Sequence, residues 1–248
     1  MRRAVRAVVA MAALLGAACG SEPPMAEPAE RPPLASPPDP GAPPDADGLT
    51  DAERDRLAAS TMRVSGIACG RTTEGSGFAV SDDVVATNAH VVLGLSNPTI
   101  ETIDGAARAG TVVAFDGVLD LALIRVDGAS FAPLPLSGEA PDGTTGAVFG
   151  WEPGPVVEPT PFRVDRPVSV RIEEVGGVDR ITRPSWLLAA DIEAGDSGAA
   201  VVDQSGTVIG VVHSTSTLGS GVGYAVRADR LAELIATGFN ENLIVPGC

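Results

Sequence analysis

The chain has 248 residues, which is enough for one or two domains, and its 44% hydrophobic residues and 29 glycines are typical of a globular protein with many turns. Its formal net charge is −15, and removal of the three arginines found among residues 1–18 makes it −18. Such an acidic chain repels phosphate backbones, which excludes nucleic acid as an expected partner.

Residues 1–18 have the organisation of an export signal. Three arginines precede a short apolar stretch at residues 8–15, which is too short to span a bilayer. Small residues then lead to Cys19, a pattern similar to the lipobox of bacterial lipoproteins, in which the cysteine carries the lipid. Gly16 stands where that pattern usually has leucine, so an ordinary secretory signal cleaved nearby is the alternative. We expect export to the cell envelope and a lipid anchor on a bacterial membrane, facing the periplasm or the exterior.

Residues 19–48 form a segment rich in proline and alanine, with almost no large apolar side chain. Such a segment cannot bury enough surface to offset the entropy lost when it is ordered. We therefore predict a disordered tether at residues 19–48, followed by one folded domain at residues 49–248.

The folded domain begins with a short helical pattern at residues 49–61, capped by Thr50 or Asp51. Short runs rich in Val, Ile and Thr then predict β-strands separated by turns. Apolar residues return to helical spacing at residues 228–238, where Gly238 is the stop signal. The predicted strands are residues 62–69, 76–81, 84–92, 99–103, 110–116, 121–126, 145–150, 166–175, 186–192, 198–203, 207–214 and 223–228.

About a dozen strands and one terminal helix indicate an all-β class with antiparallel pairing. A parallel α/β fold would need crossover helices between the strands, and the sequence has no pattern for them. The hydrophobic pattern by itself leaves a barrel and a sandwich as alternatives.

Three short motifs carry the residues of a catalytic triad, in the order His, Asp, Ser. His90 lies in ATNAHVV, Asp120 directly precedes LALIRV, and Ser197 lies in GDSG. A serine hydroxyl is a weak nucleophile, so it needs an imidazole base and a carboxylate that orients the imidazole. The chain has only two histidines, His90 and His213, so there are few candidates for the base. Asp116 is the rival carboxylate, but a glycine turn follows it instead of the apolar strand.

Residues 75–92, 119–126 and 190–212 together resemble the three sequence blocks of the chymotrypsin-fold, or trypsin-like, serine proteases. Their amino-acid sequences are most similar to those of bacterial periplasmic HtrA-like enzymes and of actinobacterial membrane-tethered trypsin-like proteases, here without a PDZ domain. The resemblance covers about residues 62–236.

The resemblance implies a fold of two six-stranded Greek-key β-barrels with a short C-terminal helix. The first barrel is expected at about residues 62–130 and the second at about residues 142–236, with a crossing linker between them. The active site is expected in the cleft between the barrels.

The implied function is an exported serine endopeptidase that works through an acyl-enzyme intermediate, with the three motif residues as its triad. The backbone N–H groups of Gly195 and Ser197 are the expected oxyanion donors. The family usually has GDSGGP, whereas Ala199 and Ala200 follow GDSG here, which narrows the site or alters the local backbone.

Substrate-binding residues are expected near the nucleophile. Asp191, six residues before Ser197, has the position that gives trypsin its preference for basic residues, although bacterial members with other specificities share it. His213 ends a strand in the wall of the primary specificity pocket, one position after the histidine of glutamate-specific relatives. It therefore either binds an acidic side chain or is a structural histidine near the triad carboxylate. The edge expected to pair with the substrate backbone is Ser214, Thr215 and Ser216.

Three cysteines remain to be assigned. With Cys19 lipidated, Cys69 and Cys248 are left as a pair in an exported chain, and we predict a disulfide between them. The resemblance to the tethered actinobacterial proteases implies the same pairing. Two free thiols are the alternative.

Other classes of site have little support in the sequence. Two separated histidines and a cysteine pair make a poor zinc site, and no glycine-rich phosphate loop joins a strand to a helix, so no metal and no cofactor are expected. The expected partners are protein or peptide substrates and a membrane, and the chain is expected to be a monomer. The alternative function is a catalytically silent module that binds polypeptides in the cell envelope.

Overall fold

The computed structural model describes residues 39–95, 97–151, 158–216 and 220–247. The predicted signal, Cys19 and Cys248 lie outside these residues. Cys69 is disulfide-bonded, and its pairing with Cys248 stays a prediction. None of the helices in this part of the chain is long and apolar enough to cross a membrane.

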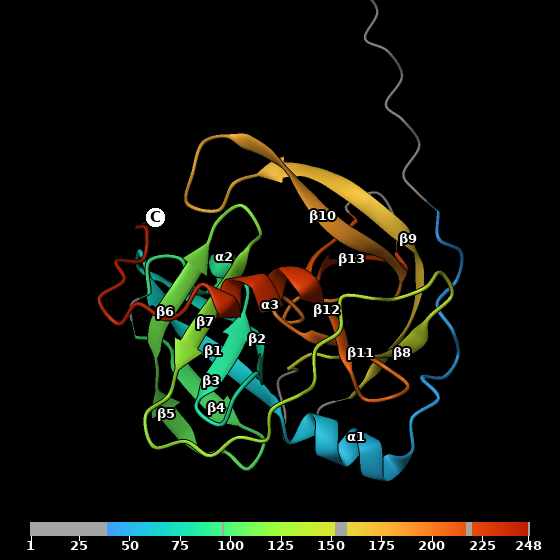
Figure 1. Cartoon of the computed structure of the whole chain (residues 1–248), viewed down its shortest axis with the longest axis horizontal. Coiled ribbons are helices and arrows are strands. Elements are labelled where there is room, and N and C mark those ends of the chain that lie inside the picture. The colour runs from blue at the N-terminus through green and yellow to red at the C-terminus, as the bar shows by residue number, and fades with distance from the viewer. Residues whose placement is uncertain (1–38, 96, 152–157, 217–219, 248) are drawn as a thin grey trace, which may run out of the picture. The chain divides into compact units, whose positions relative to one another are not determined.

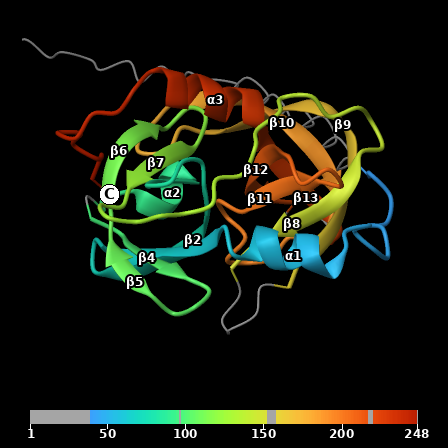
Figure 2. The same cartoon turned by 60° about the horizontal axis from the view of Figure 1, so that its bottom comes forward.

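An antiparallel sheet of seven strands occupies the first half of the described chain (Figures 1 and 2). Its elements are β1 (Thr61–Ala68), β2 (Arg71–Ala79), β3 (Val84–Thr87), the short helix α2 (Ala89–Val92), β4 (Thr99–Thr102), β5 (Ala107–Ala109), β6 (Thr111–Asp116) and β7 (Leu121–Arg125). The strands pair in the order β5-β4-β1-β2-β3-β7-β6.

A closed barrel of six antiparallel strands occupies the second half. Its strands are β8 (Thr145–Phe149), β9 (Thr160–Glu173), β10 (Arg180–Ala189), β11 (Ala200–Asp203), β12 (Val208–Thr215) and β13 (Val222–Arg227). They pair in the order β10-β13-β12-β11-β8-β9, and the last strand closes on the first. The two sheets confirm the predicted all-β class.

The hairpin of β9 and β10 reaches from the barrel to the first sheet. Its strands are 14 and 10 residues long, and they continue past the rest of the barrel in Figure 1. Near the tip, the Val175 N–H donates to Gly117 O at 3.0 Å. Gly117 lies in the turn between β6 and β7, so the barrel supports the turn that leads to Asp120.

The first sheet differs from the predicted six-stranded barrel, because it has a seventh strand and its order does not close. The added strand is β5, whose three residues are all exposed. It is held by backbone pairing with β4. A strand without buried side chains leaves no hydrophobic pattern, so the sequence did not indicate it.

The strand predicted at residues 84–92 ends at Thr87, and α2 follows it. Pairing with β7 stops at Thr87, and the next residue, Asn88, donates from Nδ2 to Asp120 O at 2.8 Å. This side-chain contact turns the chain out of the sheet. The prediction of one continuous strand was therefore wrong, and His90 lies in a helical turn.

Both predicted longer helices form. α1 (Asp51–Ala58) begins after Thr50, which makes a capping box with Glu53. α3 (Ala228–Ala236) buries one face and ends before Gly238, whose φ is +85°. α3 contacts β7 of the first sheet and both β12 and β13 of the barrel.

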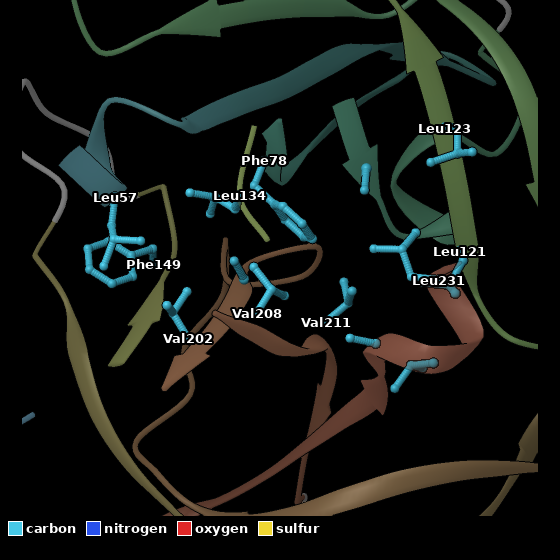
Figure 3. Close-up of a cluster of buried hydrophobic side chains, with 14 of the residues drawn as sticks. Leu57, Phe78, Leu121, Leu123, Leu134, Phe149, Val202, Val208, Val211 and Leu231 are labelled. Carbon is cyan, nitrogen blue, oxygen red and sulfur yellow. The ribbon is translucent and has the colours of Figure 1, made fainter. Parts of the chain in front are cut away.

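The two sheets and α3 meet in one hydrophobic cluster (Figure 3). Each fully buried leucine, valine or phenylalanine contributes about 1.5–3 kcal/mol relative to an exposed side chain. The cluster therefore fixes how the two sheets pack. Its fully buried members include Leu57, Phe78, Leu121, Leu123, Phe149, Val202, Val208, Val211 and Leu231.

Residues 39–48 pack on the folded domain, although we predicted them to belong to the tether. The buried Asp47 carboxylate accepts hydrogen bonds from Arg54 Nε at 3.0 Å and from its terminal nitrogen at 2.8 Å. Arg163 of β9 donates to two backbone carbonyls of the segment. Polar contacts hold this segment on the domain. The prediction of disorder considered only its lack of apolar residues, so it missed these contacts.

We expect Asp47→Asn to lower the free energy of unfolding by about 1–2 kcal/mol at neutral pH, because it removes a charged acceptor from a nearly buried site. Asp51→Asn is the matched control, since Asp51 also pairs with Arg54 but its side chain is 97% exposed, against 3% for Asp47. The hydrogen bond from Arg54 lowers the pKa of Asp47. The difference between wild type and Asp47→Asn is therefore present above pH 4 and lost as the pH falls through the lowered pKa. Urea unfolding measures it, and equal effects of the two variants would contradict this account.

Candidate active site

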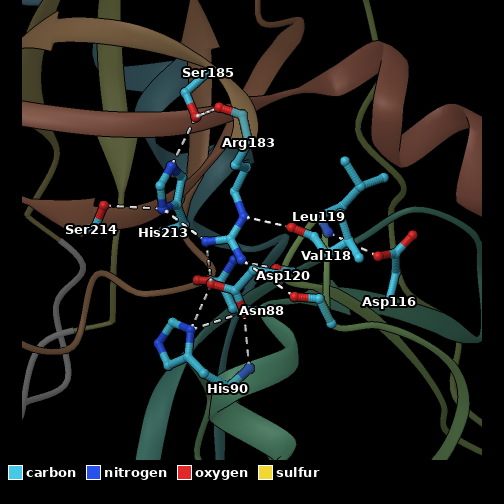
Figure 4. Close-up of polar contacts among 11 residues, drawn as sticks. Asn88, His90, Asp116, Val118, Leu119, Asp120, Arg183, Ser185, His213 and Ser214 are labelled. Atoms are coloured by element: carbon cyan, nitrogen blue, oxygen red, sulfur yellow. Dashed lines mark hydrogen bonds and ion pairs between the residues drawn. The ribbon is translucent and has the colours of Figure 1, made fainter. Parts of the chain in front are cut away.

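His90 and Asp120, predicted as base and orienting carboxylate, form a hydrogen-bonded pair (Figure 4). His90 Nδ1 lies 2.8 Å from Asp120 Oδ2 and 3.0 Å from Oδ1, and the His90 backbone N–H donates to Oδ1 at 2.9 Å. The Asp120 side chain is 3% exposed and the His90 side chain is 37% exposed. The carboxylate is thus shielded from water, while a substrate can reach the imidazole. With Nδ1–H donated to the carboxylate, Nε2 is left as the acceptor.

Asp120 lies between β6 and β7, in a backbone conformation that is uncommon for residues other than glycine, with a φ of +58°. Asn88 Nδ2 donates to its carbonyl oxygen at 2.8 Å. Asp116, the rival candidate, instead accepts the Leu119 N–H at 2.8 Å within the same turn. The structure therefore pairs His90 with Asp120 and gives Asp116 a place in the turn.

Ser76 of β2 attaches the loop that carries Ser197 to the first sheet. The Ser76 N–H donates to Ser197 O at 2.7 Å, and its hydroxyl donates to Gly195 O at 2.6 Å. The same hydroxyl accepts the Trp151 N–H at 2.7 Å. Two carbonyls of the nucleophile loop are thus fixed on the first sheet, although Ser197 itself precedes a strand of the barrel.

The backbone conformation at the two glycines of GDSG favours glycine for steric reasons. Gly195 has a φ of +111° and Gly198 a φ of +89°. A methyl group on Gly198 would lie 2.1 Å from Ser76 O, so only glycine fits there.

Ser197 lies close to α2, which carries His90, with Gly75 between them. A methyl group on Gly75 would lie 2.7 Å from Val91 Cγ2 and 2.8 Å from Ser197 O. Ser197 is partly exposed, and its hydroxyl makes no hydrogen bond to another described residue. The N–H groups of Gly195 and Ser197 also lack an acceptor within the described part of the chain, which leaves them free to bind an oxyanion.

Ala199 and Ala200 are both fully buried. Ala199 packs in the core of the barrel and Ala200 in the cluster between the sheets. Their methyl groups fill these cores, so neither side chain narrows the surface on which a substrate would lie.

His213 lies at a bulge in β12 and is 4% exposed. Its Nε2 is 3.0 Å from Ser185 Oγ, and its Nδ1 is 3.0 Å from Ser214 Oγ and 3.5 Å from a terminal nitrogen of Arg183. Burial, and then the charge of Arg183, lower the pKa of His213 to about 3. The structure therefore favours the structural alternative over a role in binding substrate.

The other predicted substrate-binding residues lie at the end of β12 and after β10. Asp191 is exposed in the loop that follows β10. Ser214 and Thr215 end β12, and the Ser216 N–H donates to a carbonyl of β13 at 3.1 Å. Pairing with β11 ends at Val211, so Ser214 and Thr215 pair with β13 on one edge and have no strand on the other among the described residues.

A hollow of about 400 Å³ opens beside His90. Its lining is Ala68, Cys69, Arg71, Thr73, His90 and Leu93. Within the described ranges, no three His, Cys, Asp or Glu side chains gather closely enough to hold a metal ion.

The sequence did not indicate two residues that the structure adds to the site. Ser76 lies within residues 75–92, the first block of the family resemblance. The sequence of that block gave no reason to expect hydrogen bonds from Ser76 to the loop that carries Ser197. Arg183 lies on β10, and its side chain is 1% exposed, 3.5 Å from Asp120 Oδ2. An arginine in a strand is expected to face solvent, so no local signal separates Arg183 from exposed arginines.

The chain is similar to known serine proteases over most of its folded part. The trypsin-like peptidase domain matches residues 75–211. The serine protease Rv3671c of Mycobacterium tuberculosis is 33% identical over 183 residues, which is 71% of this chain and 45% of that protein. The serine protease HTR4 of Rattus norvegicus is 31% identical, over 66% of this chain and 34% of that protein. The chain therefore matches less than half the length of these curated relatives.

The fold agrees with that of a solved relative. The crystal structure of the active form of the Rv3671c protease has a TM-score of 0.76 to this chain, at 29% identity, and the match covers 84% of this chain and 93% of that one.

We expect His213 to remain neutral above about pH 4, because burial holds its pKa near 3. In proton–carbon NMR spectra of the imidazole groups, the signal that is present in the wild type and missing from His213→Gln belongs to His213. This signal should not titrate between pH 5 and pH 8 in the wild type.

The lowered pKa of His213 also makes the stability of the folded chain depend on pH. The unfolded chain protonates this histidine near pH 6.5 and the folded chain only near pH 3, so stability decreases as the pH falls between these values. The contribution is at most about 1.4 kcal/mol per pH unit, and His213→Gln should lack it. A titrating His213 signal in the native spectrum contradicts both expectations.

Proposed function

We propose that this chain, which belongs to the trypsin-like peptidase family, is a serine endopeptidase that cleaves peptide bonds through an acyl-enzyme intermediate. The observation that carries the proposal is the contact of His90 Nδ1 with the buried Asp120 carboxylate at 2.8 Å, close to the loop of Ser197. A shielded carboxylate that orients an accessible imidazole is the arrangement that activates a serine hydroxyl near neutral pH.

In the first half of the reaction, Ser197 Oγ attacks the carbonyl carbon of the substrate and its proton passes to His90 Nε2. The carbonyl oxygen becomes an oxyanion, which the N–H groups of Gly195 and Ser197 bind. Asp120 holds the Nδ1–H and stabilises the imidazolium. His90 then protonates the leaving amine, the C–N bond breaks, and the acyl group stays on Ser197.

In the second half, a water molecule gives a proton to His90 and attacks the acyl carbon. The tetrahedral intermediate collapses, Ser197 Oγ leaves and takes the proton back, and the carboxylic acid product departs. The Ser197 to His90 hydrogen bond is expected to form when substrate binds, since such contacts are often long in free enzymes.

The substrates that we propose are extended segments of proteins or peptides. The edge of Ser214 and Thr215 that faces away from β13 can pair with an extended backbone, as a strand added to a sheet. The similar proteins of Mycobacterium tuberculosis and Rattus norvegicus are serine proteases by name, which supports the same reaction class.

A fluorophosphonate probe should label the folded wild-type chain and should not label Ser197→Ala, because the probe reacts with an activated serine. Ser197→Ala and His90→Ala are each expected to lower kcat for a peptide substrate by roughly 10⁴-fold or more. Ser205→Ala is the control, since Ser205 is an exposed serine in the turn between β11 and β12. A folded wild-type chain that stays unlabelled would support the alternative of a silent polypeptide-binding module.

We also propose that the peptidase acts in the cell envelope, exported by residues 1–18 and lipid-anchored through Cys19. Support comes from the sequence pattern alone: an arginine-led apolar stretch, then small residues and a cysteine. Bacterial-type lipidation adds several acyl chains, which is enough for stable anchoring. The predicted Cys69 to Cys248 disulfide is consistent with such an oxidising location.

Metabolic labelling with a fatty-acid analogue should mark the wild-type chain and leave Cys19→Ala unmarked, with the mutant released from the membrane fraction. Gly16→Leu is the control, because it completes the usual pattern before the cysteine and should keep the label. Label on Cys19→Ala would contradict the anchor.

A further inference from the structure

Arg183 is a buried cation that the triad chemistry leaves without a role. It extends from β10 of the barrel to the turn between β6 and β7 of the first sheet (Figure 4). Its Nε donates to Val118 O at 2.9 Å, and a terminal nitrogen donates to Gly117 O at 3.4 Å. The other terminal nitrogen lies 3.5 Å from Asp120 Oδ2. A guanidinium loses favourable hydration when it is buried, and these contacts with one turn replace it.

The turn that Arg183 holds is the one whose geometry sets the position of the catalytic carboxylate. Asp120 follows this turn directly, in its left-handed conformation, and points its carboxylate at His90. The carbonyls of Gly117 and Val118 face Arg183, and the hairpin tip supports the same turn through Val175. Arg183 therefore contacts both the backbone that carries Asp120 and the carboxylate itself.

The hydrogen bonds around His213 fix which nitrogens donate. Arg183 can only donate, so His213 Nδ1, 3.5 Å from it, is the acceptor and the proton sits on Nε2. Nε2–H then donates to Ser185 Oγ at 3.0 Å, and that hydroxyl donates to the carbonyl oxygen of Arg183 at 3.4 Å. The network closes on Arg183 and keeps His213 uncharged, so it adds no second positive charge near Asp120.

We propose that Arg183 is a positioning residue of the triad. Its guanidinium holds the turn that carries Asp120 and offsets part of the carboxylate charge, so that His90 stays neutral, and able to accept a proton, at a lower pH. This role rests on the proposed peptidase function.

The charges that face His90 determine the direction in which its protonation shifts when Arg183 is removed. Removing the Arg183 cation leaves Asp120 uncompensated, which favours the imidazolium and raises the pH at which His90 takes up a proton. The other titratable groups nearby are not mutated in the Arg183 variants, but His213 also loses the charge of Arg183, so its imidazole signal is followed together with that of His90. These groups are Asp116 at the end of β6, Arg71 of β2 in the hollow, His213 of β12, and Tyr224 of β13 beside His213.

Two substitutions separate charge from geometry. Arg183→Met removes the charge and keeps much of the bulk, and Arg183→Lys keeps the charge but loses the planar set of donors. The control is Arg180→Met, an exposed arginine at the start of the same strand. The measurement is kcat/KM for a peptide substrate against pH, with active sites counted by fluorophosphonate labelling.

For Arg183→Met we expect the acid limb of the profile to move up by about 0.5–1 pH unit and kcat on the plateau to fall by roughly tenfold. Arg183→Lys should lose kcat without moving the limb, and Arg180→Met should match the wild type. An unmoved limb in Arg183→Met, or an equal shift in Arg183→Lys, would overturn the charge role.

A second readout does not need turnover. The NMR titration of the His90 imidazole should move to higher pH in Arg183→Met by the same amount as the kinetic limb. If the wild type neither turns over peptide nor reacts with the probe, the proposed function fails, while this titration still tests the coupling. If Arg183→Met does not fold, Arg183→Gln, which is uncharged and retains N–H donors, takes its place in both measurements.

Discussion

The candidate active site depends on the packing between two sheets, because its residues come from both of them. His90 and Asp120 belong to the first sheet, whereas Ser197 directly precedes the barrel strand β11. The apolar cluster at the interface brings these elements together, but apolar packing does not set positions to a few tenths of an ångström. Hydrogen bonds do so here: Ser76 of the first sheet holds two carbonyls of the nucleophile loop, and Arg183 of the barrel holds the turn before Asp120. Each sheet thus supports the catalytic residue of the other.

Burying polar groups at such an interface is unfavourable unless every one of them is paired. The network of Arg183, His213 and Ser185 meets that condition through donors and acceptors that match around a closed circuit. The bulge at His213 contributes to it, because the extra residue aims the ring into the interface. The charges also balance, since one buried cation faces one buried carboxylate, and the histidine beside the cation is neutral.

Backbone conformations that are rare elsewhere gather in the same place. Asp120 has positive φ without being glycine, and Gly195 and Gly198 have positive φ on either side of the nucleophile. Such conformations persist only when their surroundings hold them. Here the surroundings are the carbonyl contacts of Ser76, Asn88 and Arg183. The arrangement exposes one hydroxyl, one imidazole edge and two N–H groups to a substrate.

The sequence by itself determined the all-β class and both longer helices, and it predicted the triad, because each of these leaves a local signal. A capping pair at Thr50 and Glu53, runs rich in Val, Ile and Thr, and three short motifs in a fixed order each extend over only a few residues. The tertiary structure alone decided what depends on contacts distant in the chain. β5 is held only by its neighbour, residues 39–48 by polar bonds to the domain, and His213 by a bulge that shifts its face. The burial of Arg183 also depends on a distant contact. An arginine in a strand is identified as buried only when a carboxylate 63 positions away is known to lie beside it.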